Sequence, residues 1–72
     1  MIEEEIKKRI LEGIPGCQVN VVVFGNRAEI SVVSESFTEL NRVQRDQAIY
    51  KYVNDYIAEG ALHAVTVIAT AR

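Results

Sequence analysis

Two neighbouring stretches of the chain alternate apolar and polar residues with a period of two, and this alternation restricts the possible folds more than any other feature. One parity of these stretches is apolar at Cys17, Val19, Val21 and Val23, then at Ala28, Ile30 and Val32. Gly25-Asn26-Arg27 lies between the two stretches. Such alternation is typical of an antiparallel sheet with one covered face. We therefore predict a β-hairpin formed by residues 17–24 and 28–34.

The residues before the hairpin have helical periodicity. Isoleucines recur at four-residue steps, at Ile2, Ile6, Ile10 and Ile14. This spacing predicts an amphipathic helix over residues 2–13, ended by Gly13-Ile14-Pro15-Gly16. Three acid–base pairs have the i,i+4 spacing that stabilises a helix surface: Glu3–Lys7, Glu4–Lys8 and Glu5–Arg9.

After a short turn at about residues 34–40, the sequence predicts a second long helix and a last strand. Asn41 and Gln44 have the spacing of a capping box, and Gly60 is the expected end of a helix over about residues 42–59. The strand should cover residues 62–70, where His63 shares its parity with Val65. The resulting order indicates an α+β fold with a three-stranded sheet and the helices packed on one face.

Length and composition restrict the protein class. Seventy-two residues with one cysteine predict a single domain, residues 1–72, without an internal disulfide. The longest apolar stretch is only a few residues, far short of the ~20 that span a membrane, and the acidic start is unlike a signal peptide. We expect a cytoplasmic protein without a membrane partner. Its net charge of −2 gives no overall attraction to nucleic acid.

Four short motifs follow one another in the second half of the chain. They are Val32-Val33-Ser34-Glu35-Ser36-Phe37, Arg42-Val43-Gln44-Arg45, Ile49-Tyr50 and Leu62-His63-Ala64-Val65. In this order and spacing they resemble the signature of the BolA family, and residues 42–65 look closest to its short bacterial branch. The resemblance covers roughly residues 1–70. It implies the order α-β-β-α-α-β, in which the first of the two later helices is short, similar to a class II KH domain.

The same resemblance implies a function. Members of the BolA family bind monothiol glutaredoxins and share a 2Fe-2S cluster with them, using the histidine of the H-A motif as a ligand. His63 corresponds to that histidine, so the resemblance implies a cluster shared with a glutaredoxin and no cofactor held by this chain alone. The sequence contains no arrangement of residues typical of catalysis, and we expect a binding module rather than an enzyme.

The sequence departs from the family pattern at three places. Many members carry a second ligand, His or Cys, in the loop between the first two strands, about where this chain has Arg27. Arginine has no lone pair to give to iron, so His63 would be the single ligand from this chain. Glu39 replaces a usual glycine, and the sequence ends at Arg72 without the tail of many relatives.

Several other residues are candidates for contacts with a partner. Arg42 and Arg45 begin the second long helix and could contact a partner protein or phosphates, although acidic residues lie among them. Arg27 is a further candidate, as is Tyr50, which we expect at the surface. Cys17 shares its parity with the strand valines, which favours a core position over a ligand role.

Two alternatives remain open from sequence. One is a KH-like nucleic-acid-binding transcriptional regulator of morphology or stress genes that contacts DNA through Arg42 and Arg45. The negative net charge of the chain makes this regulator the less favoured interpretation, because binding to several phosphates needs basic contacts. The other is an interaction domain without any metal. The sequence also leaves open whether the chain forms a homodimer.

Overall fold

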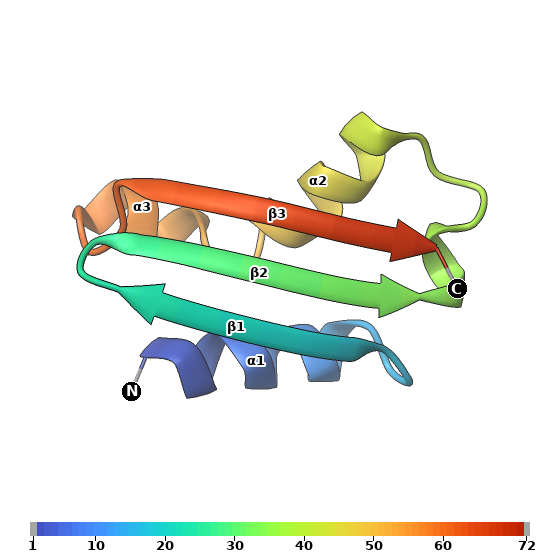
Figure 1. The fold of residues 1–72 in the computed structure, drawn as a ribbon, viewed down its shortest axis with the longest axis horizontal. Helices are drawn as coiled ribbons and strands as arrows, with labels where there is room; N and C mark the ends of the chain where they lie inside the picture. Colours follow the sequence, from blue (N-terminus) through green and yellow to red (C-terminus); the bar gives the residue numbers. More distant parts are fainter. Residues whose placement is uncertain (1, 72) are drawn as a thin grey trace.

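The computed structural model describes residues 2–71 as one three-stranded sheet with the helices on one of its faces (Figure 1). The elements in chain order are α1 (Ile2–Gly13), β1 (Gln18–Phe24), β2 (Arg27–Ser34), the 3-10 helix η1 (Glu35–Phe37), α2 (Arg42–Tyr50), α3 (Asn54–Glu59) and β3 (Ala64–Ala71). The predicted α+β class and the position of the helices on one face are confirmed.

The sheet has the order β1-β2-β3 and is mixed. β1 and β2 form the predicted antiparallel hairpin, while β3 lies parallel to β2, so that η1, α2 and α3 make the long crossover that parallel strands need. The turn is shorter than predicted, because Arg27 is not part of it but pairs with Phe24 as the first residue of β2. Gly25 has a φ of 60°, which suits the first central position of a two-residue turn.

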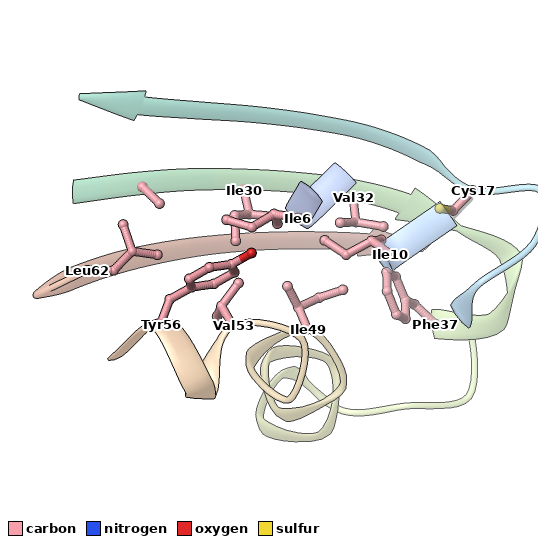
Figure 2. Packing of buried hydrophobic residues seen from close by; sticks show 11 residues of the cluster. Ile6, Ile10, Cys17, Ile30, Val32, Phe37, Ile49, Val53, Tyr56 and Leu62 are labelled. Carbon is pink, nitrogen blue, oxygen red and sulfur yellow. The ribbon is translucent and has the colours of Figure 1, made fainter. Parts of the chain in front are cut away.

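The core lies between the sheet and the helices (Figure 2). Its fully buried side chains come from every layer: Ile6, Ile10, Ile30, Val32, Phe37, Ile49, Val53 and Leu62. Cys17 is also buried, which confirms its predicted core position. Inward residues alternate with exposed ones along all three strands, so the opposite face of the sheet is open to solvent.

The prediction of one helix over residues 42–59 is wrong, because the helix is interrupted between Tyr50 and Asn54. At the interruption, the amides of Tyr52 and Val53 bond to carbonyls only three residues earlier, and Val53 takes the non-helical angles φ −125° and ψ 0°. The interruption leaves the Tyr52 carbonyl available to the Arg9 guanidinium at 2.9 Å. The Tyr52 carbonyl thus accepts a hydrogen bond from Arg9 of α1 instead of one from a backbone N–H of its own helix.

The two predicted caps of this region are confirmed. The Asn41 and Gln44 side chains each accept a hydrogen bond from the other residue's backbone N–H, at 2.8 and 3.0 Å, and so complete the capping box. Gly60 ends α3 in the left-handed conformation, with a φ of 83°. These caps fix where α2 begins and where the chain turns toward β3.

The three predicted acid–base pairs on α1 are wrong. Glu3, Glu5 and Arg9 instead contact β1 and α3, and among residues 2–71 the ion pair with i,i+4 spacing is Lys8–Glu12 at 3.9 Å. Tertiary partners offer these side chains better-placed donors and acceptors than an exposed helix surface, where such pairs contribute only a few tenths of a kcal/mol.

Within residues 2–71, none of the helices has the length and apolar character needed to cross a membrane.

Candidate metal and partner site

The hairpin turn and the start of β3 meet at one end of the sheet. The parallel register places Arg27 opposite Ala64, the residue after His63. The Asn26 carbonyl accepts hydrogen bonds from the N–H groups of His63 at 2.8 Å and of Ala64 at 3.4 Å. The turn of the hairpin therefore holds the backbone of His63 beside Arg27.

The end of α3 holds the same segment from the other side. The N–H groups of Ala61 and Leu62 donate to the Tyr56 carbonyl at 2.9 and 3.2 Å, and the Leu62 side chain is buried. The backbone of His63 is thus fixed between a buried leucine and the hairpin turn, while the residue itself is exposed. The predicted start of the last strand at residue 62 is wrong, because His63 precedes β3 and does not follow its alternation.

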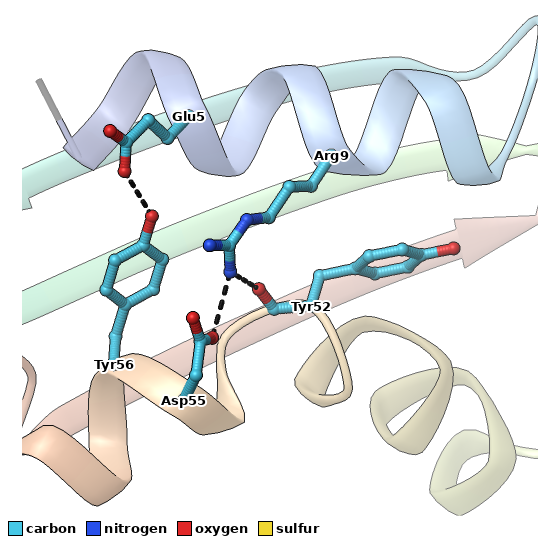
Figure 3. A network of polar contacts seen from close by, with 5 residues as sticks. All are labelled: Glu5, Arg9, Tyr52, Asp55 and Tyr56. Carbon is cyan, nitrogen blue, oxygen red and sulfur yellow. Dashed lines mark hydrogen bonds and ion pairs between the residues drawn. The ribbon is translucent and has the colours of Figure 1, made fainter.

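A polar network joins α3 to α1 and so supports the position of Leu62 and His63 (Figure 3). Arg9 Nη1 donates to the Tyr52 carbonyl at 2.9 Å and to Asp55 Oδ1 at 2.8 Å. The Tyr56 hydroxyl donates to the Glu5 carboxylate, and the Arg9 guanidinium lies 4.6 Å from the centre of the Tyr56 ring. One arginine therefore connects three groups around the interruption between α2 and α3.

The network also changes the acidity of its members. The hydrogen bond from Arg9 lowers the pKa of the Asp55 carboxyl, so this carboxylate stays charged at neutral pH. The hydrogen bond to Glu5, together with burial, raises the pKa of the Tyr56 hydroxyl, so this hydroxyl stays a donor. Both shifts preserve the contacts that hold α3 against α1.

A hollow on the open face of the sheet adjoins His63. It has a volume of about 240 Å³ and is lined by Phe24, Arg27, Ala28, Glu29, Ala64 and Thr66. Phe24 is 48% exposed at its rim, an unusual exposure for an aromatic side chain. The imidazole, a guanidinium and an aromatic ring thus share one end of the sheet.

For a cluster bound by His or Cys ligands, His63 is the one such residue that this end of the described chain offers. Arg27 has no lone pair for a metal, and Cys17 precedes β1 at the opposite end, roughly 20 Å away along the strand. Cys17 is also buried, and burial raises the pKa of its thiol, which disfavours the thiolate that binds metals. Residues 2–71 contain no group of three His, Cys, Asp or Glu side chains placed to hold a metal ion. A cluster here would need its other ligands from another molecule.

The predicted residues Arg42 and Arg45 lie elsewhere. Together with Asp46 they face the middle of β3 and line a hollow of about 280 Å³ with Val67, Ile68 and Ala69. Val67 is four residues beyond His63, which is about 13 Å along a strand. The structure therefore brings His63 together with Arg27, and separates both from the pair of arginines on α2.

Tyr50 lies between the end of the sheet that holds His63 and the arginines of α2. Its predicted surface position is wrong. The side chain is half-buried against the core, and its hydroxyl donates a 2.8 Å hydrogen bond to the Val65 carbonyl. A helical wheel drawn for one continuous helix misplaces Tyr50, because the interruption after this residue changes the direction of the chain.

Asn26 and Phe24 also belong to this site, although no sequence motif marks them. Asn26 acts through its backbone carbonyl, and a contact of this kind does not depend on the type of side chain. Phe24 ends β1 on the parity that faces solvent, and this could be read from the alternation of residues 17–24.

Known proteins similar to this chain show its family. Residues 25–72 match the family model for BolA-like protein. The chain belongs to the BolA family. A protein of the rpoN–murA intergenic region of Acinetobacter guillouiae is 31% identical over 72 residues, which cover 100% of this chain and 87% of that relative. The acid stress protein IbaG of Escherichia coli K12 is 29% identical over 69 residues, or 96% of this chain and 82% of IbaG.

The BolA fold is also found among solved structures. BolA1 from Arabidopsis thaliana superposes with a TM-score of 0.83 at 14% identity, covering 96% of this chain and 89% of BolA1. At that identity the likeness concerns the fold alone. The BolA match begins at the hairpin turn and includes Arg27, His63 and the arginines of α2, whereas Phe24 lies just before it.

Proposed function

We propose that this BolA-family chain is a non-enzymatic adaptor that binds a monothiol glutaredoxin in the cytoplasm and contributes His63 to a shared 2Fe-2S cluster. The complex would serve cluster assembly and transfer, or iron and stress signalling. The observation that carries the proposal is the position of His63, an exposed residue on a backbone fixed by Asn26 and Leu62.

The chemistry of the site suits a donated ligand. A neutral imidazole binds iron through a ring nitrogen, and the exposed position of His63 makes this side chain accessible to another molecule. The fixed backbone limits the entropy lost when the ligand is placed. The glutaredoxin cysteine and glutathione would each supply one thiolate ligand from outside the chain. When bound, the cluster would be the transferred cargo or the group that senses iron.

Arg27 has a different part in the proposal. Its guanidinium is a permanent cation beside His63, able to form paired hydrogen bonds with a carboxylate of the partner. Phe24, half exposed in the adjoining hollow, would supply the apolar contact. The residue that replaces the usual second ligand would thus bind the partner instead of the metal.

The stress-related part of the proposal is supported by a relative. IbaG, 29% identical over 69 residues, is named an acid stress protein. This name favours a role for the adaptor under stress conditions.

The test is to co-express the chain with the monothiol glutaredoxin of the same organism and to record visible absorption and circular dichroism. We expect His63→Ala to lose the cluster bands of the complex, and His63→Cys to keep a cluster with a changed spectrum, because a thiolate also binds iron. Thr70→Ala, an exposed position at the other end of β3, is the control and should change nothing. An unchanged spectrum for His63→Ala would show that His63 is not a ligand.

A DNA-binding regulator is the second candidate, favoured by the two arginines that line the hollow beside β3. Asp46 in the same hollow reduces the positive charge, and Arg45 Nε already donates to the Leu40 carbonyl at 2.9 Å. Binding to duplex DNA through several phosphates would weaken steeply with salt. Absence of measurable binding at low salt removes this candidate.

A further inference from the structure

β3 is an edge strand whose own residues do not protect it. It lies at the end of the order β1-β2-β3, and its eight residues, Ala64–Ala71, include neither a charged residue nor a proline. Edge strands present unpaired N–H and C=O groups, which proteins commonly protect with charges, prolines or bulges. Ile68 on this strand is 55% exposed. The edge is therefore suited to bind a further strand.

Two hydrogen bonds show which backbone groups face outward. Ala64 directs its N–H toward the turn before β2, whereas the Val65 carbonyl points away from β2 and accepts from the Tyr50 hydroxyl. Because the backbone groups alternate in direction along a strand, Val67 and Ala69 also present their N–H and C=O groups to the edge. Tyr50 occupies only the first outward carbonyl of the strand.

Next to these outward groups lies the hollow formed with α2. Its volume is about 280 Å³, and its lining combines Val67, Ile68 and Ala69 with Arg42, Arg45 and Asp46. Arg42 is exposed, and within residues 2–71 its guanidinium has no hydrogen bond or ion pair. Backbone donors and acceptors, apolar surface and an available cation are thus adjacent.

We propose that the edge of β3 at Val67–Ala69 binds an extended peptide that carries an acidic side chain. The peptide adds a fourth strand through hydrogen bonds with the outward groups of Val67 and Ala69, as in other cases of strand addition. One of its side chains enters the hollow, where its carboxylate pairs with Arg42. Main-chain contacts provide affinity, and the cation selects acidic sequences.

Charge favours such a peptide over a second copy of this chain. If two copies paired through their β3 edges, both sets of Arg42 and Arg45 would flank the same junction. Each hollow has two arginines and one aspartate, so the junction would concentrate positive charge. A peptide with a carboxylate complements this charge.

This surface is separate from the cluster site. Val67 lies about 13 Å along β3 from His63, and the two hollows have no lining residue in common. Loss of His63 therefore leaves the peptide site intact, and either proposal can fail without the other.

The test uses two capped peptides with the purified chain, acetyl-Thr-Val-Glu-Val-Thr-amide and the same sequence with Lys in place of Glu. Amide nuclear magnetic resonance should show the largest shifts, and slowed hydrogen exchange, at Val67 and Ala69 for the Glu peptide. Arg42→Glu should weaken binding about tenfold or more, because a charge-assisted hydrogen bond is lost. The matched charge change Lys7→Glu, at an exposed position of α1, should leave the affinity unchanged.

A Glu peptide with alternate amides N-methylated should lose binding, since it lacks the donors for strand addition. Equal affinity for the Lys peptide, shifts confined to the open face, or no binding at millimolar concentration would each overturn the proposal. Concentration-dependent dimerisation that the peptide inhibits would assign the edge to a second copy. Shifts at Val67 and Ala69 from a thymidine hexanucleotide, without peptide binding, would assign it to single-stranded nucleic acid.

Discussion

At each edge of the sheet, a backbone group forms a hydrogen bond with a side chain, but the surroundings of the two edges differ. At β1, the Glu3 carboxylate accepts the Val23 N–H at 3.1 Å, and the unbroken helix α1 runs alongside the strand (Figure 1). At β3, the Tyr50 hydroxyl donates to the Val65 carbonyl, and the strand is flanked by two shorter helices and the hollow of Arg42.

The difference shows how one small sheet can separate stability from recognition. α1 buries Ile6 and Ile10 in the core, so the β1 side depends on apolar packing. The β3 side contains the exposed His63, the available Arg42 and the outward backbone groups of Val67 and Ala69. Substitutions on the β1 side should therefore change the free energy of unfolding, and those at exposed positions on the β3 side should change binding.

The largest effect is expected for Ile6→Ala, which removes a fully buried side chain of α1. The cavity and the lost burial should lower the free energy of unfolding by about 2–5 kcal/mol. Urea denaturation measures this change. Leu11→Ala, at a 41% exposed position of the same helix, is the matched control and should cost less than about 1 kcal/mol. Equal losses for the two variants would contradict the role of α1 packing at the β1 edge.

The next effect is expected for Gly13→Ala at the end of α1. A Cβ atom here would lie 2.5 Å from Tyr52 Cζ, so the Tyr52 ring must move. We expect a loss of about 1–3 kcal/mol in the free energy of unfolding, typical of overpacking. In a Tyr52→Ala background the same substitution should cost nothing or stabilise, because alanine favours helix over glycine by about 1 kcal/mol. A double-mutant cycle by denaturation checks this, and additive costs would exclude the contact as the cause.

A smaller effect is expected for Tyr56→Phe, which removes the hydroxyl that donates to Glu5. The free energy of unfolding at pH 7 should fall by about 1 kcal/mol. Because folding raises the pKa of Tyr56, this contribution is fully present below the unfolded tyrosine pKa of about 10 and is lost as pH rises through the folded pKa. Denaturation of both proteins at pH 7 and pH 11 measures the difference, and a gap independent of pH would disagree with the assignment.

The sequence predicted the elements whose signals are local. The alternation in residues 17–24 and 28–34 gave the hairpin and its covered face, and Asn41, Gln44 and Gly60 gave the helix ends. These features depend on backbone groups a few residues away. The interruption after Tyr50 could not be predicted in this way, because the Tyr52 carbonyl finds its partner in Arg9, 43 residues earlier.

Only part of the candidate site could be predicted, because the rest depends on contacts between residues distant in the sequence. The motif around His63 identified this residue and the family. The exposure of His63 follows from the turn at Asn26 and the burial of Leu62, which only the fold brings together. In the same way, parity along residues 62–70 could not reveal that β3 begins after His63.

The smallest effect concerns the β1 edge itself. Glu3→Ala removes the carboxylate that accepts the Val23 N–H, whereas Glu4→Ala removes an exposed acid of the same helix turn. Both variants lose a similar favourable interaction with the helix dipole, so the difference between them isolates the edge hydrogen bond. We expect Glu3→Ala to be less stable than Glu4→Ala by about 0.5 kcal/mol and to exchange its Val23 amide hydrogen faster. If Val23 exchanges at the same rate in both variants, the side chain does not protect this edge, and α1 acts there through its packing alone.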